Sequence, residues 1–271
     1  MTPASKIAVA ALLVAATVAA RGHDTWFEPL PATAAGQRVF ALGTGNRFPV
    51  FEFALGYEYL VGSGCRGAGA SAAPLAHVED RPTALVLRSA TPLKSGKAGA
   101  AHTCWAALTP FDVVVPPDKV ELYLKEIQAS PALRATWAAM AARGLPWKER
   151  YTKFARIELA GVGLREALPL GMDVRLDSPR QPIRAGDALT FQVLREGAPM
   201  AGLAVELVGN LSPLGIWRKT DAQGRVSVPL PVAGRWILRG VDLRVARHSA
   251  DEWESWFVVL GFEALPRSPA P

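Results

Sequence analysis

The sequence predicts a mainly β protein, with immunoglobulin-like or transthyretin-like β-sandwich domains and a short helical pair inserted between them. Short apolar runs rich in β-branched residues alternate with Gly, Pro and Ser clusters in residues 37–115 and again from residue 173 onward. Runs of this kind are typical of antiparallel sandwiches. Residues 118–143 instead show helical periodicity. Half of the 271 residues are hydrophobic, which excludes a disordered chain.

Residues 1–22 have the pattern of a removable export signal. Lys6 precedes an apolar stretch at 7–20 that is too short to span a bilayer. Small residues allow cleavage after Ala20 or after Gly22, and we favour Gly22. We therefore expect a periplasmic or secreted protein with no membrane span after processing.

Residues 23–115 are expected to form an N-terminal β-sandwich domain, with the Gly- and Ala-rich stretch 62–74 as a surface loop. The two cysteines of the sequence, Cys65 and Cys104, lie in this domain. An oxidising compartment favours a disulfide between them. The alternative, a pair of thiolate metal ligands, is disfavoured because neither belongs to a close Cys or His pair of the kind that zinc sites use.

Residues 116–164 are expected to be a helical linker or insertion. Val120, Tyr123, Leu124 and Ile127 recur at the spacing of one helix face. Ser130 followed by a proline has the pattern of a second helix start, and a glycine at 144 that of its end.

Residues 165–265 are expected to form a C-terminal immunoglobulin-like β-sandwich domain, followed by a tail at 266–271. Six or seven short strands separated by turn residues fit about 95 residues of this domain. Its expected core comprises Leu189, Phe191, Val193, Val205, Leu207, Trp236 and Leu238.

The charge balance and the motifs narrow the class of function. Thirty Lys and Arg face 24 Asp and Glu, a net charge of +6, and removal of Lys6 and Arg21 leaves 28 minus 24, or +4. A balance this mild, without a dense basic run, disfavours nucleic-acid binding. The sequence has no G-x-S-x-G, H-E-x-x-H or P-loop motif, so we expect a binding protein rather than an enzyme.

Several blocks of the mature sequence, in order, resemble the DUF4198 family. They are HDTWFEP at 23–29, PPDKVELYL at 116–124, YTKFARIEL at 151–159, IRAGDALTFQVLREGAPMAG at 183–202, TDAQGRVSVPLPVAGRWILRG at 220–240 and DEWESWFVVLGFE at 251–263. Members are exported bacterial proteins commonly labelled as nickel-uptake or NikM-like periplasmic components. The resemblance implies a divalent transition metal as ligand, nickel or cobalt first and copper second, no organic cofactor, and a membrane metal-transport component as partner.

His23 is the first candidate metal ligand. Cleavage after Gly22 would place its free amine and its imidazole on one residue, where both can chelate one metal ion. Asp24 and Glu28 are close enough in sequence to add oxygen ligands. The alternative is that this segment merely begins the first strand. His102 is a further candidate because it precedes Cys104 by two residues.

Asp242 stands where the resemblance leads us to expect a histidine. A carboxylate is a harder ligand than an imidazole and shifts preference away from nickel and copper. The acidic cluster at 251–254 either flanks a strand or, with Trp253 and Trp256, forms an aromatic platform for a sugar. The alternative function is therefore a structural or adhesive module that recognises envelope polysaccharide or protein and carries no metal.

Overall fold

A computed structural model of the chain describes residues 23–67, 70–92, 102–159, 167–177, 182–212 and 214–267. The expected leader at 1–22 and residues 268–271 of the expected tail lie outside this part. The described residues form a mainly β structure with two α-helices, which confirms the predicted fold class. None of the helices in the described ranges is long and apolar enough to cross a membrane.

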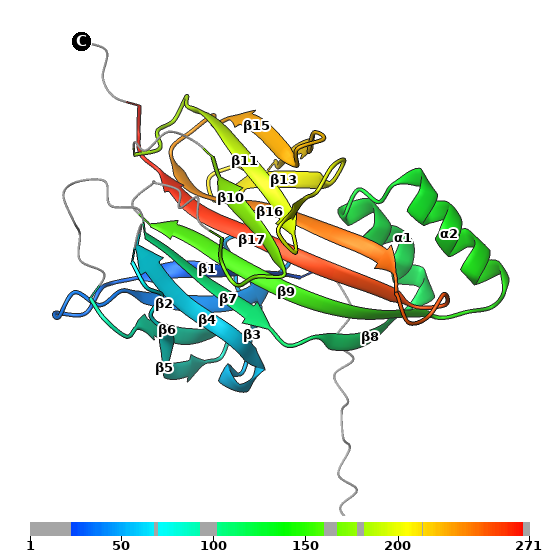
Figure 1. Cartoon of the computed structure of the whole chain (residues 1–271), viewed down its shortest axis with the longest axis horizontal. Coiled ribbons are helices and arrows are strands. Elements are labelled where there is room, and N and C mark those ends of the chain that lie inside the picture. Colours follow the sequence, from blue (N-terminus) through cyan, green and yellow to red (C-terminus); the bar gives the residue numbers. More distant parts are fainter. Residues whose placement is uncertain are drawn as a thin grey trace, which may run out of the picture.

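The strands form three sheets (Figure 1). The N-terminal sheet has the order β1-β2-β6-β5, with β3 paired to β2. Its strands are β1 (Asp24–Leu30), β2 (Val39–Gly45), β3 (Phe53–Ala54), β5 (Leu75–Arg81) and β6 (Ala84–Ser89). The C-terminal sheet has the order β10-β11-β12, with β15 paired to β11. Its strands are β10 (Met172–Leu176), β11 (Ala188–Arg195), β12 (Ala198–Pro199) and β15 (Arg225–Pro229).

The large sheet lies between these two and has the order β14-β13-β16-β17-β9-β7-β4, with β8 paired to β9. A 3-10 helix, η1 (Tyr57–Tyr59), precedes its first strand. The strands of the large sheet are β4 (Leu60–Gly67), β7 (His102–Leu108), β8 (Phe111–Val115), β9 (Trp147–Leu159), β13 (Ala204–Gly209), β14 (Ile216–Lys219), β16 (Gly234–Val245) and β17 (Trp253–Ala264).

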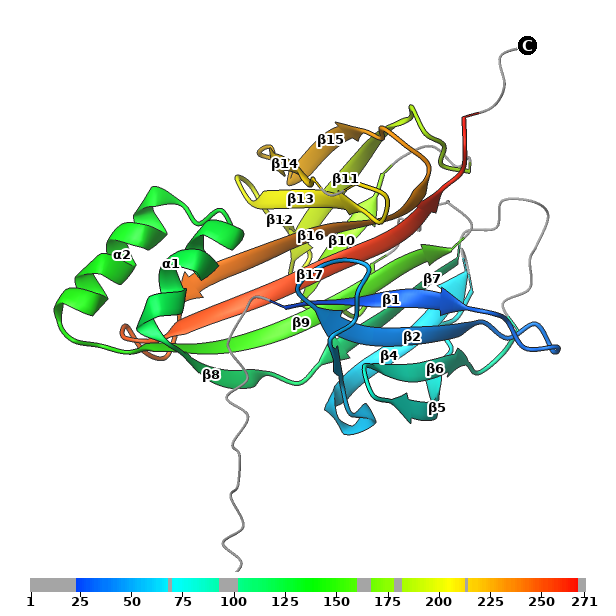
Figure 2. The same cartoon turned by 180° about the vertical axis from the view of Figure 1, so that it is seen from behind.

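Side-chain alternation divides the large sheet between two cores. On β17, Val258 and Leu260 pack in the cluster shared with the C-terminal sheet. Val259, between them, packs with Trp26 of the N-terminal sheet. Because successive side chains of a strand point to opposite faces, a strand covered on both faces is apolar almost throughout. Figure 2 shows β1 lying over β9 and β17 on one of these faces.

The two helices, α1 (Pro117–Glu126) and α2 (Pro131–Ala142), confirm the predicted helical pair. Ser130 caps α2 by accepting a hydrogen bond from the backbone N–H of Leu133, and Gly144 after the helix has φ 74°. The face predicted for α1 packs on the far end of β9, β16 and β17, on Trp147, Leu243 and Trp253 among others. In Figure 1 the helices lie at the end of the long strands opposite β1 and β2.

The large sheet contains strands from both sides of the expected insertion. β4, β7 and β8 precede it, and β13, β14, β16 and β17 follow it. The range 116–164 is helical only as far as Ala142, because β9 occupies its second half and pairs with both β7 and β17. The expected domain boundaries therefore do not coincide with breaks between sheets.

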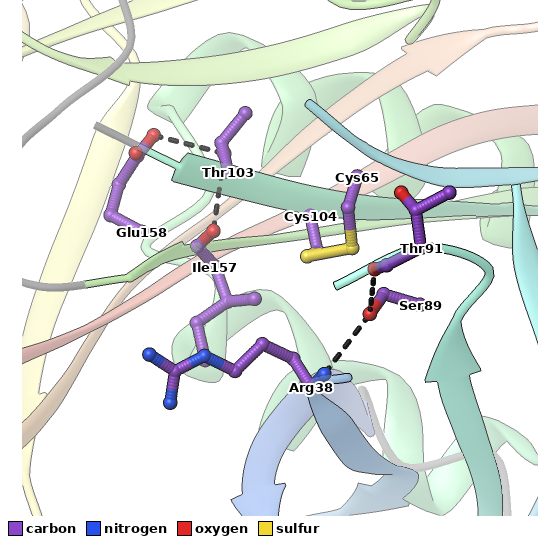
Figure 3. Close-up of a disulfide and its surroundings, with 8 residues drawn as sticks. All are labelled: Arg38, Cys65, Ser89, Thr91, Thr103, Cys104, Ile157 and Glu158. Atoms are coloured by element: carbon purple, nitrogen blue, oxygen red, sulfur yellow. Dashed lines mark hydrogen bonds between the residues drawn. A yellow bond between two sulfur atoms is a disulfide. The ribbon is translucent and has the colours of Figure 1, made fainter. Parts of the chain in front are cut away.

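The disulfide between Cys65 and Cys104 is confirmed, and both residues are fully buried. The cysteines are directly opposite each other on β4 and β7, with 4.0 Å between their Cα atoms (Figure 3). The expectation of a loop at 62–74 is wrong for its first half, because β4 runs to Gly67. Small residues are accommodated in this strand, and at Gly64 a Cβ would meet the ring of Trp105.

All seven residues expected in the C-terminal core are buried in one cluster. Their exposed fractions do not exceed 1%, and they pack between the C-terminal sheet and the large sheet. The period-two pattern of β11 was therefore sufficient to identify its core face.

Candidate functional site

His23 lies directly before β1, in a buried corner of the N-terminal sheet. Its side chain is 9% exposed, and Nδ1 is 3.9 Å from Oε2 of Glu52. The imidazole also makes an edge contact with the ring of Phe53, with 5.0 Å between ring centroids. The corner therefore brings one imidazole and one carboxylate together beside the residue that we expect to become the N-terminus.

Glu52 is the residue that sequence analysis missed. It reaches His23 because β2 lies between β1 and β3, and Glu52 directly precedes β3. Asn46 orients the carboxylate: Nδ2 donates to Oε2 at 2.7 Å and the backbone N–H donates to Oε1 at 3.2 Å. No spacing in the sequence reveals this contact, which is created by strand pairing.

Asp24 faces the large sheet and forms an ion pair. Nη1 of Arg239 donates to Oδ2 of Asp24 at 2.5 Å, and the same guanidinium binds Glu206. The Asp24 side chain is 7% exposed. The nearby carboxylates, Asp24 foremost, raise the pKa of Arg239 further above its already high value. Asp24 is therefore held by a cation rather than presented as an open metal ligand.

Glu28 repeats this arrangement four residues further along β1. It forms an ion pair with Arg235 of β16. Trp26, between the two acidic residues, packs on Ile237, which lies between the two arginines. The face of β1 that meets β16 therefore carries an acidic residue, a tryptophan and a second acidic residue. They face an arginine, an isoleucine and a second arginine on β16.

Asp242 lies on the other face of β16, where it accepts hydrogen bonds from Arg195 and Arg244. Arg195 also donates to Glu254 at 2.6 Å, and its guanidinium carbon is 3.8 Å from the ring centroid of Trp256. A carboxylate between two arginines is electrostatically unsuited to a further cation such as a metal ion.

His102 begins β7 and is half-buried, opposite Gly67 on β4 and Leu159 on β9. It stands near the disulfide, as expected. Across the described ranges, no group of three or more His, Cys, Asp or Glu side chains could hold a metal ion. The five predicted ligands therefore do not converge on one site.

The cluster at 251–254 flanks a strand, as the simpler interpretation holds. Asp251 pairs with Arg143, and Glu252 pairs with His248 and Lys148. Trp253 is 1% exposed and stacks on Trp147. The aromatic platform suggested for this segment is therefore absent, because Trp253 faces the helices and Trp256 covers Arg195.

Lys153 is a buried cation near the first strand. It is 7% exposed, and its ammonium lies 5.4 Å from the ring centroid of Tyr151 and 5.9 Å from that of Phe257. Burial lowers the pKa of Lys153 to about 8, and the negative charge of Asp24 partly opposes this shift. Asp24 therefore lies within the field of two cations, Arg239 and Lys153.

These features define a β-sandwich protein with a histidine–carboxylate corner at the start of its first strand. The family model of DUF4198, a domain of unknown function, matches residues 167–241. The match supports the resemblance to this family that the sequence blocks indicated. It extends from before β10 into β16 and ends one residue before Asp242. No curated protein matches the chain.

Proposed function

We propose that the mature protein is an exported, non-enzymatic binding protein for a divalent transition metal ion, acting as an accessory component of nickel or cobalt uptake, with copper as the second choice. The observation that carries the proposal is the approach of His23 Nδ1 to Glu52 Oε2, 3.9 Å, at the expected start of the mature chain. Cleavage after Gly22 adds an amine to the same residue. The metal ion is the cargo of the protein, and a membrane transport component is its expected partner.

The donor set fits such a cargo. An amine and an imidazole are ligands that nickel, cobalt and copper all accept, and a carboxylate oxygen completes a mixed set. Because the protein supplies only a few donor atoms, coordination positions on the metal ion stay open. Open positions suit transfer of the ion to a partner better than permanent storage. Asn46 holds Glu52 by two hydrogen bonds, and orienting partners of this kind support metal ligands.

Calorimetric titration with nickel and with copper tests the proposal. The protein whose first residue is His23 should bind one ion. A Gly added before His23, His23→Ala and Glu52→Gln should each weaken binding by at least roughly tenfold, the size that loss of an orienting partner already has. Binding should also weaken as pH falls, because amine and imidazole must be deprotonated to coordinate.

His77→Ala and Glu79→Gln are matched controls, since both residues are exposed on β5 and pair with their own neighbours. They should bind as the unmodified protein does. Equal affinity in all forms would move the site elsewhere. No binding by the mature form would refute the metal proposal and favour the structural or adhesive module.

A further inference from the structure

A second candidate site is a cleft between the N-terminal sheet and the large sheet. It has a volume of about 290 Å³ and lies between β1 on one side and the ends of β9, β16 and β17 on the other. Clefts of roughly 300 Å³ are at the small end of those that hold organic ligands. Its apolar lining includes Phe27, Phe48, Ile157, Leu159 and Ile237.

The floor of the cleft contains a glycine, Gly261, near the C-terminal end of β17. A Cβ built there would have its nearest neighbours, atoms of Ile157 and Arg156, at 3.7 to 3.9 Å. These are ordinary van der Waals distances, so the surrounding packing does not require a glycine at this position. The missing side chain instead leaves the cleft open, between Ile157 on β9 and Ile237 on β16.

Among the described residues on its rim, the cleft has one cation that is available to a ligand. Arg235 is neutralised by Glu28, and Glu158 is bound to Arg156. Arg38, in contrast, is exposed and forms no ion pair with a described residue that lines the cleft. Figure 3 shows its side chain extending beneath Ile157, which lines the same cleft.

We propose that this cleft binds a small carboxylic acid with an apolar body, whose carboxylate meets Arg38 and whose body lies on Ile157, Ile237 and Gly261. A guanidinium presents two parallel N–H groups that match a carboxylate. Glu263, on the same rim, adds a negative charge that disfavours a doubly charged phosphate more than a single carboxylate. The apolar walls exclude a fully polar ligand, because its polar groups would lose water without gaining partners.

The first test is calorimetric titration of the mature protein with sodium octanoate below its micelle concentration, in the presence of EDTA. Octanamide has the same length but no charge. Octanoate should bind saturably and roughly fivefold more tightly than octanamide, a difference typical of a partly exposed ion pair. 3-Phenylpropanoate is titrated in parallel, and the acid that binds more tightly shows whether the cleft prefers a linear or an aromatic body. If neither acid binds, the proposal is overturned.

Variants locate the site. Gly261→Leu should abolish octanoate binding because its side chain fills the cleft, whereas Gly261→Ala should retain it. Gly62→Leu, on β4 where nothing lies within 4 Å of an added Cβ, is the matched control and should also retain binding. Arg38→Gln should weaken octanoate roughly fivefold and leave octanamide unchanged. Arg218→Gln, an exposed arginine outside the cleft, should change neither.

Unchanged binding in Gly261→Leu, or equal effects of Arg38→Gln on octanoate and octanamide, would overturn the assignment. Arg38 is exposed, so its variant tests the proposal even if Gly261→Leu fails to fold. The outcome is independent of the metal proposal, because EDTA removes the metal and His23 does not line this cleft.

Discussion

Oδ2 of Asp24 accepts a 2.5 Å hydrogen bond from Nη1 of Arg239, although the two residues are 215 positions apart. The contact ties the first strand of the N-terminal sheet to β16 of the large sheet. With Glu28 and Arg235 it encloses the buried packing of Trp26 on Ile237. The acidic residues of β1 therefore have a structural task that does not involve a metal.

This relationship predicts the effect of Asp24→Asn. Loss of the charge leaves Arg239 with Glu206 as its remaining partner, and we expect the free energy of unfolding to fall by roughly 3 kcal/mol. Metal affinity should stay the same. Denaturant unfolding and metal titration of the same variant check both parts, with the exposed Asp80→Asn as control. Lost metal binding at unchanged stability would instead make Asp24 a ligand.

Some parts of the structure could be predicted from local sequence, and others could not. Local patterns correctly predicted the buried face of α1 and the alternation of β11. The disulfide was also predicted correctly, because two cysteines in an oxidising compartment have only each other to pair with. The partners of Asp24 and Glu28 were hidden because β16 lies more than 200 residues away along the chain. Glu52 was missed because the β1-β2-β3 pairing brings it to His23, and a short strand such as β3 has no detectable pattern.

The disulfide predicts that thiol labelling of the denatured, unreduced protein finds no reactive cysteine. Replacement of Cys65 and Cys104 by serine removes a link across 39 positions, and chain entropy gives at most about 4 kcal/mol for this link. Urea unfolding of the double variant measures the loss. Two reactive thiols per chain in exported material would contradict the pairing.

The burial of Trp236 predicts a large cost for its removal. The side chain is 1% exposed, packs in the core shared by the large and C-terminal sheets, and donates from Nε1 to the carbonyl of Val232 at 3.2 Å. Trp236→Ala should therefore lower the free energy of unfolding by roughly 3 to 5 kcal/mol. Trp217→Ala, at a less buried tryptophan on β14, provides the comparison. A loss below about 1 kcal/mol, the range of surface changes, would be inconsistent with this core.

The hydrogen bonds of Glu149 on β9 indicate how the helical pair is attached to the large sheet. Its carboxylate accepts hydrogen bonds from Tyr123 Oη at 2.8 Å, Trp147 Nε1 at 2.7 Å and Ser255 Oγ. Burial raises the pKa of Glu149, although its three donors oppose the shift. Of these three donors, Tyr123 is the one on α1. Tyr123→Phe removes it and should lower the free energy of unfolding by about 1 to 3 kcal/mol. Faster amide hydrogen exchange in α1 should accompany the loss, whereas unchanged exchange and stability would mean that apolar packing alone holds the helix.

Lys153 predicts a specific dependence of stability on pH. Because burial lowers its pKa to about 8, the unfolded chain binds more protons than the folded protein between pH 8 and its ordinary pKa of 10.5. The free energy of unfolding therefore gains a contribution as pH rises through this window, and loses it as pH falls to about 8.

Lys153→Met has no group to titrate at this position, so the difference between the two proteins isolates the effect. The stability of the unmodified protein relative to Lys153→Met should rise by up to about 3 kcal/mol between pH 8 and pH 10.5. Below pH 8 the difference should be constant, because Lys153 is then charged in both states. Lys219→Met, at an exposed lysine on β14, should show no such rise. Urea unfolding at several pH values measures both stability differences. If the two differences depended on pH in the same way, Lys153 would keep its ordinary pKa in the folded protein.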